Sequence, residues 1–132
     1  MIKVQSSNNV QLPNDQKTTK FDLEERTLKF SKEVLVLLKI LPKTIISMPL
    51  ITQLVRSATS IGANCCEATE AGSKKDFINK ITIAKKEAKE TRYWLKLMLD
   101  LFPAESLKIQ KLLQEAQELN LILSAIVRNS KN

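Results

Sequence analysis

The chain has 132 residues, of which 43% are apolar and 27% are charged, and its formal net charge is +7. This length favours one domain with a core of its own. The absence of histidine excludes the commonest general base and metal ligand, and the scarcity of glycine and aromatic residues disfavours a β-sandwich or barrel.

The chain begins with a polar segment, residues 1–20, which we interpret as a flexible N-terminal tail. The first predicted helix covers about residues 22–41, with Asp22 as its N-cap and Pro42 as its stop. Its apolar stripe steps by four and three residues, as an amphipathic helix requires: Leu23, Thr27, Phe30, Val34, Leu37 and Leu41.

The second predicted helix covers about residues 48–71, with Ser47 as its N-cap. We expect Ile45 and Ile46, in the preceding loop, to cover one end of the core. The helix has a stripe of mostly small residues, Ile51, Leu54, Ala58, Ile61, Cys65 and Ala68. Gly62 lies beside this stripe, and a close approach of another helix there would offset its unfavourable helix propensity.

Gly72 and Ser73 separate the second helix from the third. Gly72 suits a left-handed helix end and Ser73 suits an N-cap, so we expect an antiparallel helical hairpin. The third predicted helix covers about 74–102 and the fourth about 104–128. Their stripes are Phe77, Ile81, Ala84, Ala88, Thr91, Leu95, Met98 and Phe102, then Ile109, Leu112, Ala116, Leu119, Leu123 and Ile126.

Four long helices joined by short connections predict an all-α fold, an antiparallel up-down-up-down four-helix bundle over residues 21–128. Residues 129–132 are then a short C-terminal tail. The first residues lack the apolar core of a signal peptide, and no window is apolar enough to span a membrane. We therefore expect a cytoplasmic protein.

Five cations fall on one side of the third helix when its residues are placed at 100° intervals. We call them the basic ridge: Lys74, Lys85, Lys89, Arg92 and Lys96. Glu87 and Glu90 fall on the opposite flank, so they do not neutralise the ridge. Such a row suits the phosphate backbone of nucleic acid, because each neutralised phosphate releases counterions. The alternative is a solvated face whose lysine stems cover apolar surface.

The same helix has apolar residues on a second side, where a lone bundle needs none. We call them the apolar back face: Ile83, Tyr93, Trp94, Leu97 and Leu101. We expect this face to form an interface between copies of the chain, because tyrosine and tryptophan are favoured there. The alternatives are a bend of the helix into neighbouring loops and the stacking of bases beside Arg92.

The sequence offers little for catalysis. Glu67 and Glu70 lie one turn apart, but without histidine or a glycine-rich phosphate loop we expect no catalytic residue, metal or cofactor. We expect Glu67 to pair with a cation of another helix. Cys65 and Cys66 are adjacent in a helix, which disfavours a disulfide between them, and we interpret both as largely packed thiols.

Two segments carry a resemblance to a known family: FDLEERTLKF (21–30) and LVRSATSIGANCCEATEAGSKKDFINKITIAKKEAKETRYWL (54–95). They resemble the 23S ribosomal RNA intervening-sequence proteins, and the accessory variability protein of diversity-generating retroelements is similar. The resemblance covers about residues 21–128. The family's characteristic positions correspond here to Arg56, Ser57, Ser60, Ile61, Asn64, Glu67, Lys74, Asp76 and Phe77.

The resemblance implies a homopentameric barrel of four-helix bundles with a basic surface and no enzymatic activity. The retroelement branch implies binding to nucleic acid and to a reverse transcriptase. We predict a non-enzymatic, ring-like homo-oligomer that binds RNA or DNA with little sequence specificity. The alternative is a protein-interaction scaffold that docks a partner such as a reverse transcriptase.

Overall fold

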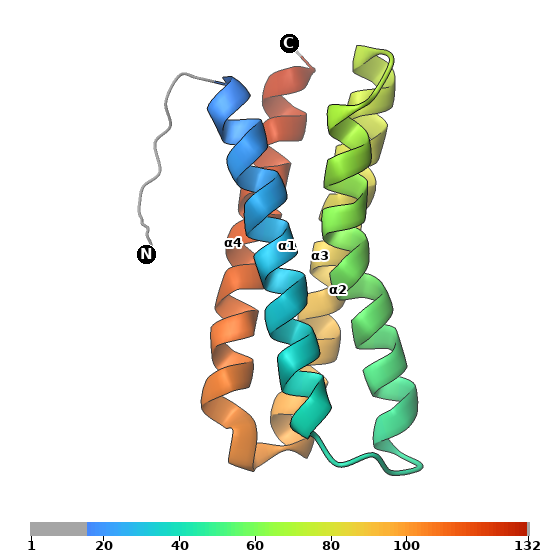
Figure 1. Ribbon diagram of the computed structural model, residues 1–132, viewed down its shortest axis with the longest axis vertical. Coiled ribbons are helices and arrows are strands. Elements are labelled where there is room, and N and C mark those ends of the chain that lie inside the picture. Colours follow the sequence, from blue (N-terminus) through green and yellow to red (C-terminus); the bar gives the residue numbers. More distant parts are fainter. Residues whose placement is uncertain (1–15, 132) are drawn as a thin grey trace.

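A computed structural model of the protein describes residues 16–131. Within that range the chain forms four α-helices and no strand (Figure 1). The helices are α1 (Gln16–Ile40), α2 (Ser47–Thr69), α3 (Lys74–Leu101) and α4 (Ser106–Ser130), and a short 3₁₀ helix, η1 (Pro103–Glu105), precedes α4. The predicted all-α fold is confirmed, while the part of the predicted tail at residues 1–15 lies outside the described residues.

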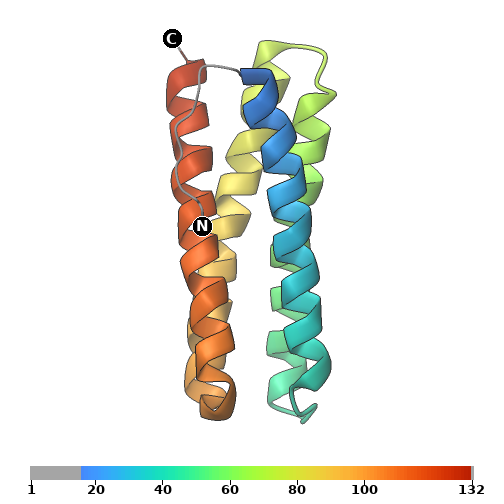
Figure 2. The ribbon, with the colours of Figure 1, turned by 60° about the vertical axis from the view of Figure 1, so that its left-hand side comes forward.

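The helices alternate in direction, and each packs against its neighbours in the chain. The α1–α2 connection and η1 lie at one end of the bundle, and the α2–α3 connection lies at the other (Figures 1 and 2). Contact between α1 and α4 closes the bundle and is the least extensive of the four contacts. This arrangement is the antiparallel up-down-up-down order that the stripes predict.

The predicted stripes form the core. All stripe residues of α1 and α2 are buried, and so are those of α3 except Phe77 and Phe102, which are partly buried. In α4, Val127 is buried and Ile126 only partly so. Full burial of one large aliphatic or aromatic side chain contributes about 1.5–3 kcal/mol, so these stripes supply the main driving force for folding.

Gly62 lets α2 approach α1 closely. A Cβ atom at this position would lie 3.1 Å from Oγ1 of Thr27, which is tighter than an ordinary van der Waals contact. Thr27 is itself buried, and its hydroxyl donates to the carbonyl oxygen of Leu23 at 2.9 Å. The close approach predicted at Gly62 is therefore confirmed, and α1 is the helix that makes it.

The α2–α3 hairpin forms as predicted, except at Gly72. Ser73 caps α3, and its Oγ accepts a hydrogen bond of 3.0 Å from the Asp76 amide. The left-handed conformation predicted for Gly72 is wrong. The amides of Glu70 and Ala71 instead donate to carbonyls three residues earlier, each at 3.1 Å, so a 3₁₀-type turn ends α2 before the chain reaches Gly72.

Two other predicted helix ends need correction. Helix α1 begins at Gln16, so Asp22 lies inside it and is not its N-cap. Nothing between Pro13 and Asp22 breaks a helix, which explains the earlier start. Helix α4 begins after η1 and continues to Ser130, so residues 129 and 130 belong to the helix and not to a tail.

The start of α2 also differs from the prediction. Ser47 is the first helical residue, and Ile46 before it makes no side-chain cap hydrogen bond. Thr44 pairs with Ser47 instead. The Ser47 amide donates to Thr44 Oγ1 at 3.0 Å, and the Thr44 amide donates to Ser47 Oγ at 2.8 Å, which is the reciprocal pairing of a capping box. Ile45 and Ile46, between these two residues, are 91% and 65% exposed, so the expectation that they cover the core is wrong.

Candidate nucleic-acid interface

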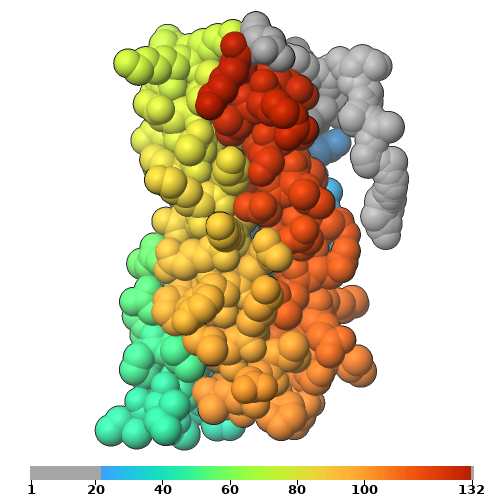
Figure 3. Space-filling model, turned by 180° about the vertical axis from the view of Figure 1, so that it is seen from behind, coloured from blue at the N-terminus to red at the C-terminus, as the bar shows by residue number. Residues whose placement is uncertain are grey.

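The basic ridge runs along the side of α3 that faces α4. Lys74 is the first residue of α3, and Lys74, Lys89 and Lys96 are exposed, whereas Lys85 and Arg92 are half-buried. Figure 3 shows α3 and α4 side by side on the face that lies at the back in Figure 1. Among residues 16–131, none of the five cations makes an ion pair within 4.0 Å. Their charges are thus available to an anionic partner.

The two glutamates on the opposite flank of α3 pair with α2. Arg56 of α2 lies 3.3 Å from Glu87 and also forms an ion pair with Glu90. The Trp94 indole N–H donates to the same Glu90 carboxylate at 2.9 Å. The Trp94 and Arg56 hydrogen bonds lower the pKa of Glu90, and the Glu90 carboxylate raises the pKa of Arg56. These acids therefore serve the α2–α3 contact and leave the ridge uncompensated, as predicted.

Other acidic residues are also paired away from the ridge. Lys80 of α3 lies 2.9 Å from Glu67 of α2, which confirms the predicted pairing of Glu67 with another helix. Arg26 of α1 lies 2.7 Å from both Glu115 and Glu118 of α4. The hydrogen bonds that Arg26 donates to these carboxylates, above all to Glu115, raise the pKa of Arg26. This bridge supports the least extensive helix contact of the bundle.

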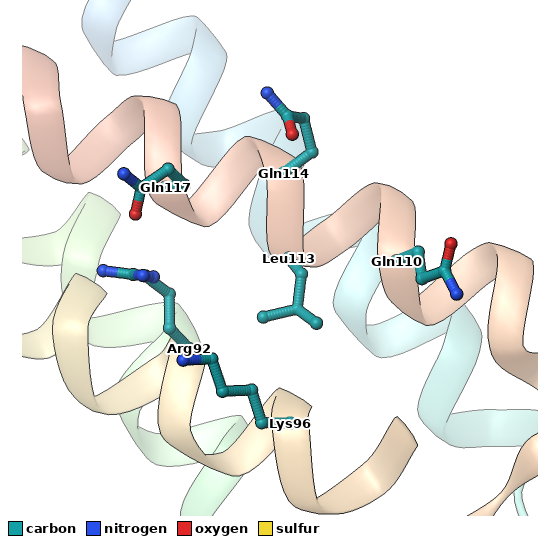
Figure 4. Close-up of a pocket in the computed structure, with 6 residues that line it drawn as sticks. All are labelled: Arg92, Lys96, Gln110, Leu113, Gln114 and Gln117. Atoms are coloured by element: carbon teal, nitrogen blue, oxygen red, sulfur yellow. The ribbon is translucent and has the colours of Figure 1, made fainter. Parts of the chain in front are cut away.

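The C-terminal half of the ridge borders an open cleft between α3 and α4, with a volume of about 260 Å³. Figure 4 shows Arg92 and Lys96 of α3 across the cleft from Gln110, Leu113 and Gln117 of α4. Further along α4, beyond the cleft, the Asn120 side chain donates to the Lys85 carbonyl oxygen at 3.1 Å. Sequence reasoning missed the α4 residues that line this cleft, because only the packing of α3 against α4 brings the two sets of lining residues together.

The apolar back face is exposed in part. Tyr93 is 58% exposed, and Ile83, Leu97 and Leu101 are also exposed. Trp94 differs, because its ring is half-buried against the core and its N–H binds Glu90. The Tyr93 and Trp94 rings meet edge to face with their centres 5.0 Å apart, which holds the tyrosine in place on the surface.

The two cysteines have different environments. Cys65 is buried, and burial raises the pKa of its thiol to about 12, so it stays protonated and unreactive at neutral pH. Cys66 is exposed, which corrects the expectation that both thiols are packed. Among residues 16–131, no three His, Cys, Asp or Glu side chains gather where they could hold a metal ion. No helix in this part of the chain is long and apolar enough to cross a membrane.

Several of the characteristic positions listed above make contacts between or within helices. The Ser57 and Thr91 hydroxyl oxygens are buried 2.9 Å apart between α2 and α3, and the Asn64 side chain donates to the Ser60 carbonyl at 2.8 Å. Arg56 and Glu67 form the ion pairs already described. Ser57, Arg56 and Glu67 therefore join α2 to α3, which carries the ridge, whereas the Asn64 bond lies within α2.

Comparison with known proteins places this fold in a family. No curated protein matches the chain. A crystal structure of a protein of unknown function from the S23 ribosomal protein family of Bacteroides thetaiotaomicron is similar, with 35% sequence identity and a TM-score of 0.75 over 83% of this chain and 97% of that one. The family model described as 23S rRNA-intervening sequence protein matches residues 19–125. The chain belongs to the family of 23S rRNA-intervening sequence proteins.

Proposed function

We propose that the protein is a cytoplasmic, non-enzymatic nucleic-acid-binding protein that holds the phosphate backbone along the basic ridge. The observation that carries this proposal is electrostatic. The ridge cations make no ion pair in the described part of the chain, although Glu87 and Glu90 lie on the same helix and are paired with Arg56. A row of free cations binds phosphates by counterion release and reads little sequence.

The proposal includes self-association through the apolar back face. Tyr93 and Leu97 are exposed beside the ridge, and an interface built on them would border Lys89 and Lys96, which lie within one turn of Tyr93. A ring-like homopentamer, the state that the family resemblance implies, would present several ridges together. When several ridges are linked in one oligomer, binding at one ridge raises the effective concentration of the nucleic acid at the others, and the affinity increases. A single ridge of five cations has no such gain.

One observation favours a second function, a scaffold for a protein partner such as a reverse transcriptase. Ile45 is 91% exposed and Leu107 is 81% exposed, and their segments lie at the same end of the bundle (Figure 1). Exposed apolar side chains of this size suit a protein contact better than a phosphate backbone. The scaffold function predicts weak binding to nucleic acid and a stable complex with the polymerase.

The test compares two variants with the same loss of charge. In the ridge variant, Lys85, Lys89, Arg92 and Lys96 are replaced by glutamine. In the control variant, four exposed cations of α1 and α4 are replaced by glutamine: Lys29, Lys32, Lys39 and Lys111. Fluorescence anisotropy with a labelled RNA or DNA at one low salt concentration measures the affinity of each protein.

The proposal predicts that the ridge variant loses about tenfold or more in affinity, while the control variant loses much less. Circular dichroism establishes that both variants retain their helices. Equal losses in the two variants would show that only net charge matters. Weak binding by the unaltered protein, together with a stable polymerase complex, would favour the scaffold function instead.

A further inference from the structure

The cleft between α3 and α4 contains a polar atom without a partner. The side-chain oxygen of Gln117 is buried, and within residues 16–131 it accepts no hydrogen bond. The Arg92 guanidinium and the Gln117 carboxamide point toward one another in Figure 4, but no hydrogen bond joins them. A buried acceptor without a donor is costly, and a turn of the Gln117 side chain toward the cleft would bring this oxygen to an N–H or O–H group of a ligand.

The other groups around the cleft are equally distinctive. Arg92 and Lys96 supply positive charge from α3. Leu113 extends from α4 toward Lys96 and gives the cleft an apolar wall (Figure 4). Gln114 also lines the cleft, but its side chain is turned away from α3 and its amide donates to Glu118 at 2.9 Å. The cleft thus combines two cations, an apolar wall and one unsatisfied acceptor.

We propose that this cleft holds one unpaired nucleotide of a single-stranded nucleic acid, with its phosphate on Arg92 and Lys96 and its base against Leu113 and Gln117. The proposal rests on the function proposed above and specifies the ligand at one position of the ridge. A fully ionised phosphate would satisfy the cations but has no hydrogen to give to Gln117. A base supplies that donor: the adenine amino group can donate to the glutamine oxygen while the glutamine amide donates to N7.

The size of the cleft agrees with a single nucleotide. Its volume of about 260 Å³ is near the lower end of ordinary small-molecule pockets, which hold roughly 300–1,000 Å³. A paired base also presents its N6 and N7 edge in the major groove, but contact of the base face with Leu113 requires that the base leave the stack, so the cleft favours an unstacked base. Backbone binding along the ridge and base binding in the cleft are then separate contributions to affinity.

The test uses two labelled DNA strands of equal length and charge, about ten nucleotides each, which is within the site size of typical single-strand binders. One is oligo(dA) and the other has abasic sites throughout. The proteins are the unaltered chain, Gln117→Leu, and the matched control Gln53→Leu, which makes the same change on α2, outside the cleft. Anisotropy titrations measure each affinity, and thermal unfolding measures the stability of each protein.

We expect the unaltered protein to bind oligo(dA) about fivefold or more tightly than the abasic strand, as one hydrogen bond and an apolar contact allow. Gln117→Leu weakens that preference, because only the apolar contact with Leu113 remains, and keeps the affinity for the abasic strand, whereas Gln53→Leu keeps the preference. Gln117→Leu also leaves the melting temperature unchanged or raises it, because the buried oxygen has no partner to lose.

Equal binding of the two strands would overturn the nucleotide site while leaving backbone binding along the ridge intact. Absence of binding to either strand would overturn both proposals. A lower melting temperature for Gln117→Leu, with an unchanged preference for oligo(dA), would show that Gln117 serves the bundle and not a base.

Discussion

At the scale of single residues, Gly62 has the strictest requirement in the bundle. It is the point where α2 approaches α1, and a Cβ atom there would lie 3.1 Å from the Thr27 hydroxyl oxygen. Thr27 is buried and its hydroxyl is bonded to its own helix, so it has little room to move. A branched side chain at Gly62 therefore forces the two helices apart.

We predict that Gly62→Val lowers the free energy of unfolding by about 1–3 kcal/mol, the usual cost of overpacking. The matched control is Gly72→Val, because a Cβ atom at Gly72 meets nothing within 4 Å. Urea denaturation followed by circular dichroism measures both variants. Equal stability of Gly62→Val and the unaltered protein would show that the α1–α2 contact is looser than described.

At the scale of elements, a single side-chain cap starts α3 in the hairpin of α2 and α3. Ser73 ends the connection and accepts a hydrogen bond from the Asp76 amide, which would otherwise lack a partner in the first turn of α3. Helix α3 begins directly after Ser73, and it carries the ridge, the back face and one wall of the cleft.

We predict that Ser73→Ala lowers the free energy of unfolding by about 1 kcal/mol, as the loss of an N-cap does. Ser73→Asp keeps an acceptor at the same position and should retain most of the stability. Urea midpoints with an unchanged denaturant slope give the comparison. If the alanine and aspartate variants were equally stable, the cap would contribute nothing.

The elements could be predicted because their signals are local and periodic. The stripe of α1 repeats without interruption, and all of its residues are buried in the bundle. Helix starts were harder to predict. Ser47 has a side chain that suits an N-cap, but it forms a reciprocal hydrogen-bonded pair with Thr44, three residues before it. Either residue has a suitable side chain, and the choice depends on how the loop turns.

The candidate site was predictable only in part, for a similar reason. The ridge lies on one helix, so residue spacing alone gives its direction. The cleft requires Arg92 of α3 and Gln117 of α4 to face each other, and helix packing sets that relation. Ile45 is apolar, and hydrophobicity alone suggests that it is buried. It lies instead in the turn between Thr44 and Ser47 and is exposed.

At the scale of the whole molecule, α3 has three distinct sides. Its core side holds the bundle together, its α4 side presents the ridge, and its outer side presents Tyr93 and Leu97. Exposed aromatic and aliphatic side chains on one face are typical of an interface between subunits. Assembly through this face is the part of the proposal that concerns the molecule as a unit.

We predict that Tyr93→Ala combined with Leu97→Lys dissociates the oligomer, because it removes an aromatic contact and buries a charge in the interface. The control combines Leu28→Ala with Leu121→Lys, which changes two exposed leucines of α1 and α4 in a comparable way. Size-exclusion chromatography with light scattering gives the mass of each protein. A monomeric unaltered protein would contradict the proposed assembly.

The most direct test of nucleic-acid binding through the ridge is the dependence of affinity on salt. Each phosphate contact contributes about 0.7–0.9 to the slope of log affinity against log salt concentration. Replacing Lys85, Lys89, Arg92 and Lys96 by glutamine should therefore reduce the magnitude of that slope by about three, and the control variant with the altered α1 and α4 cations should keep it. Identical slopes for the ridge variant and the unaltered protein would contradict the account.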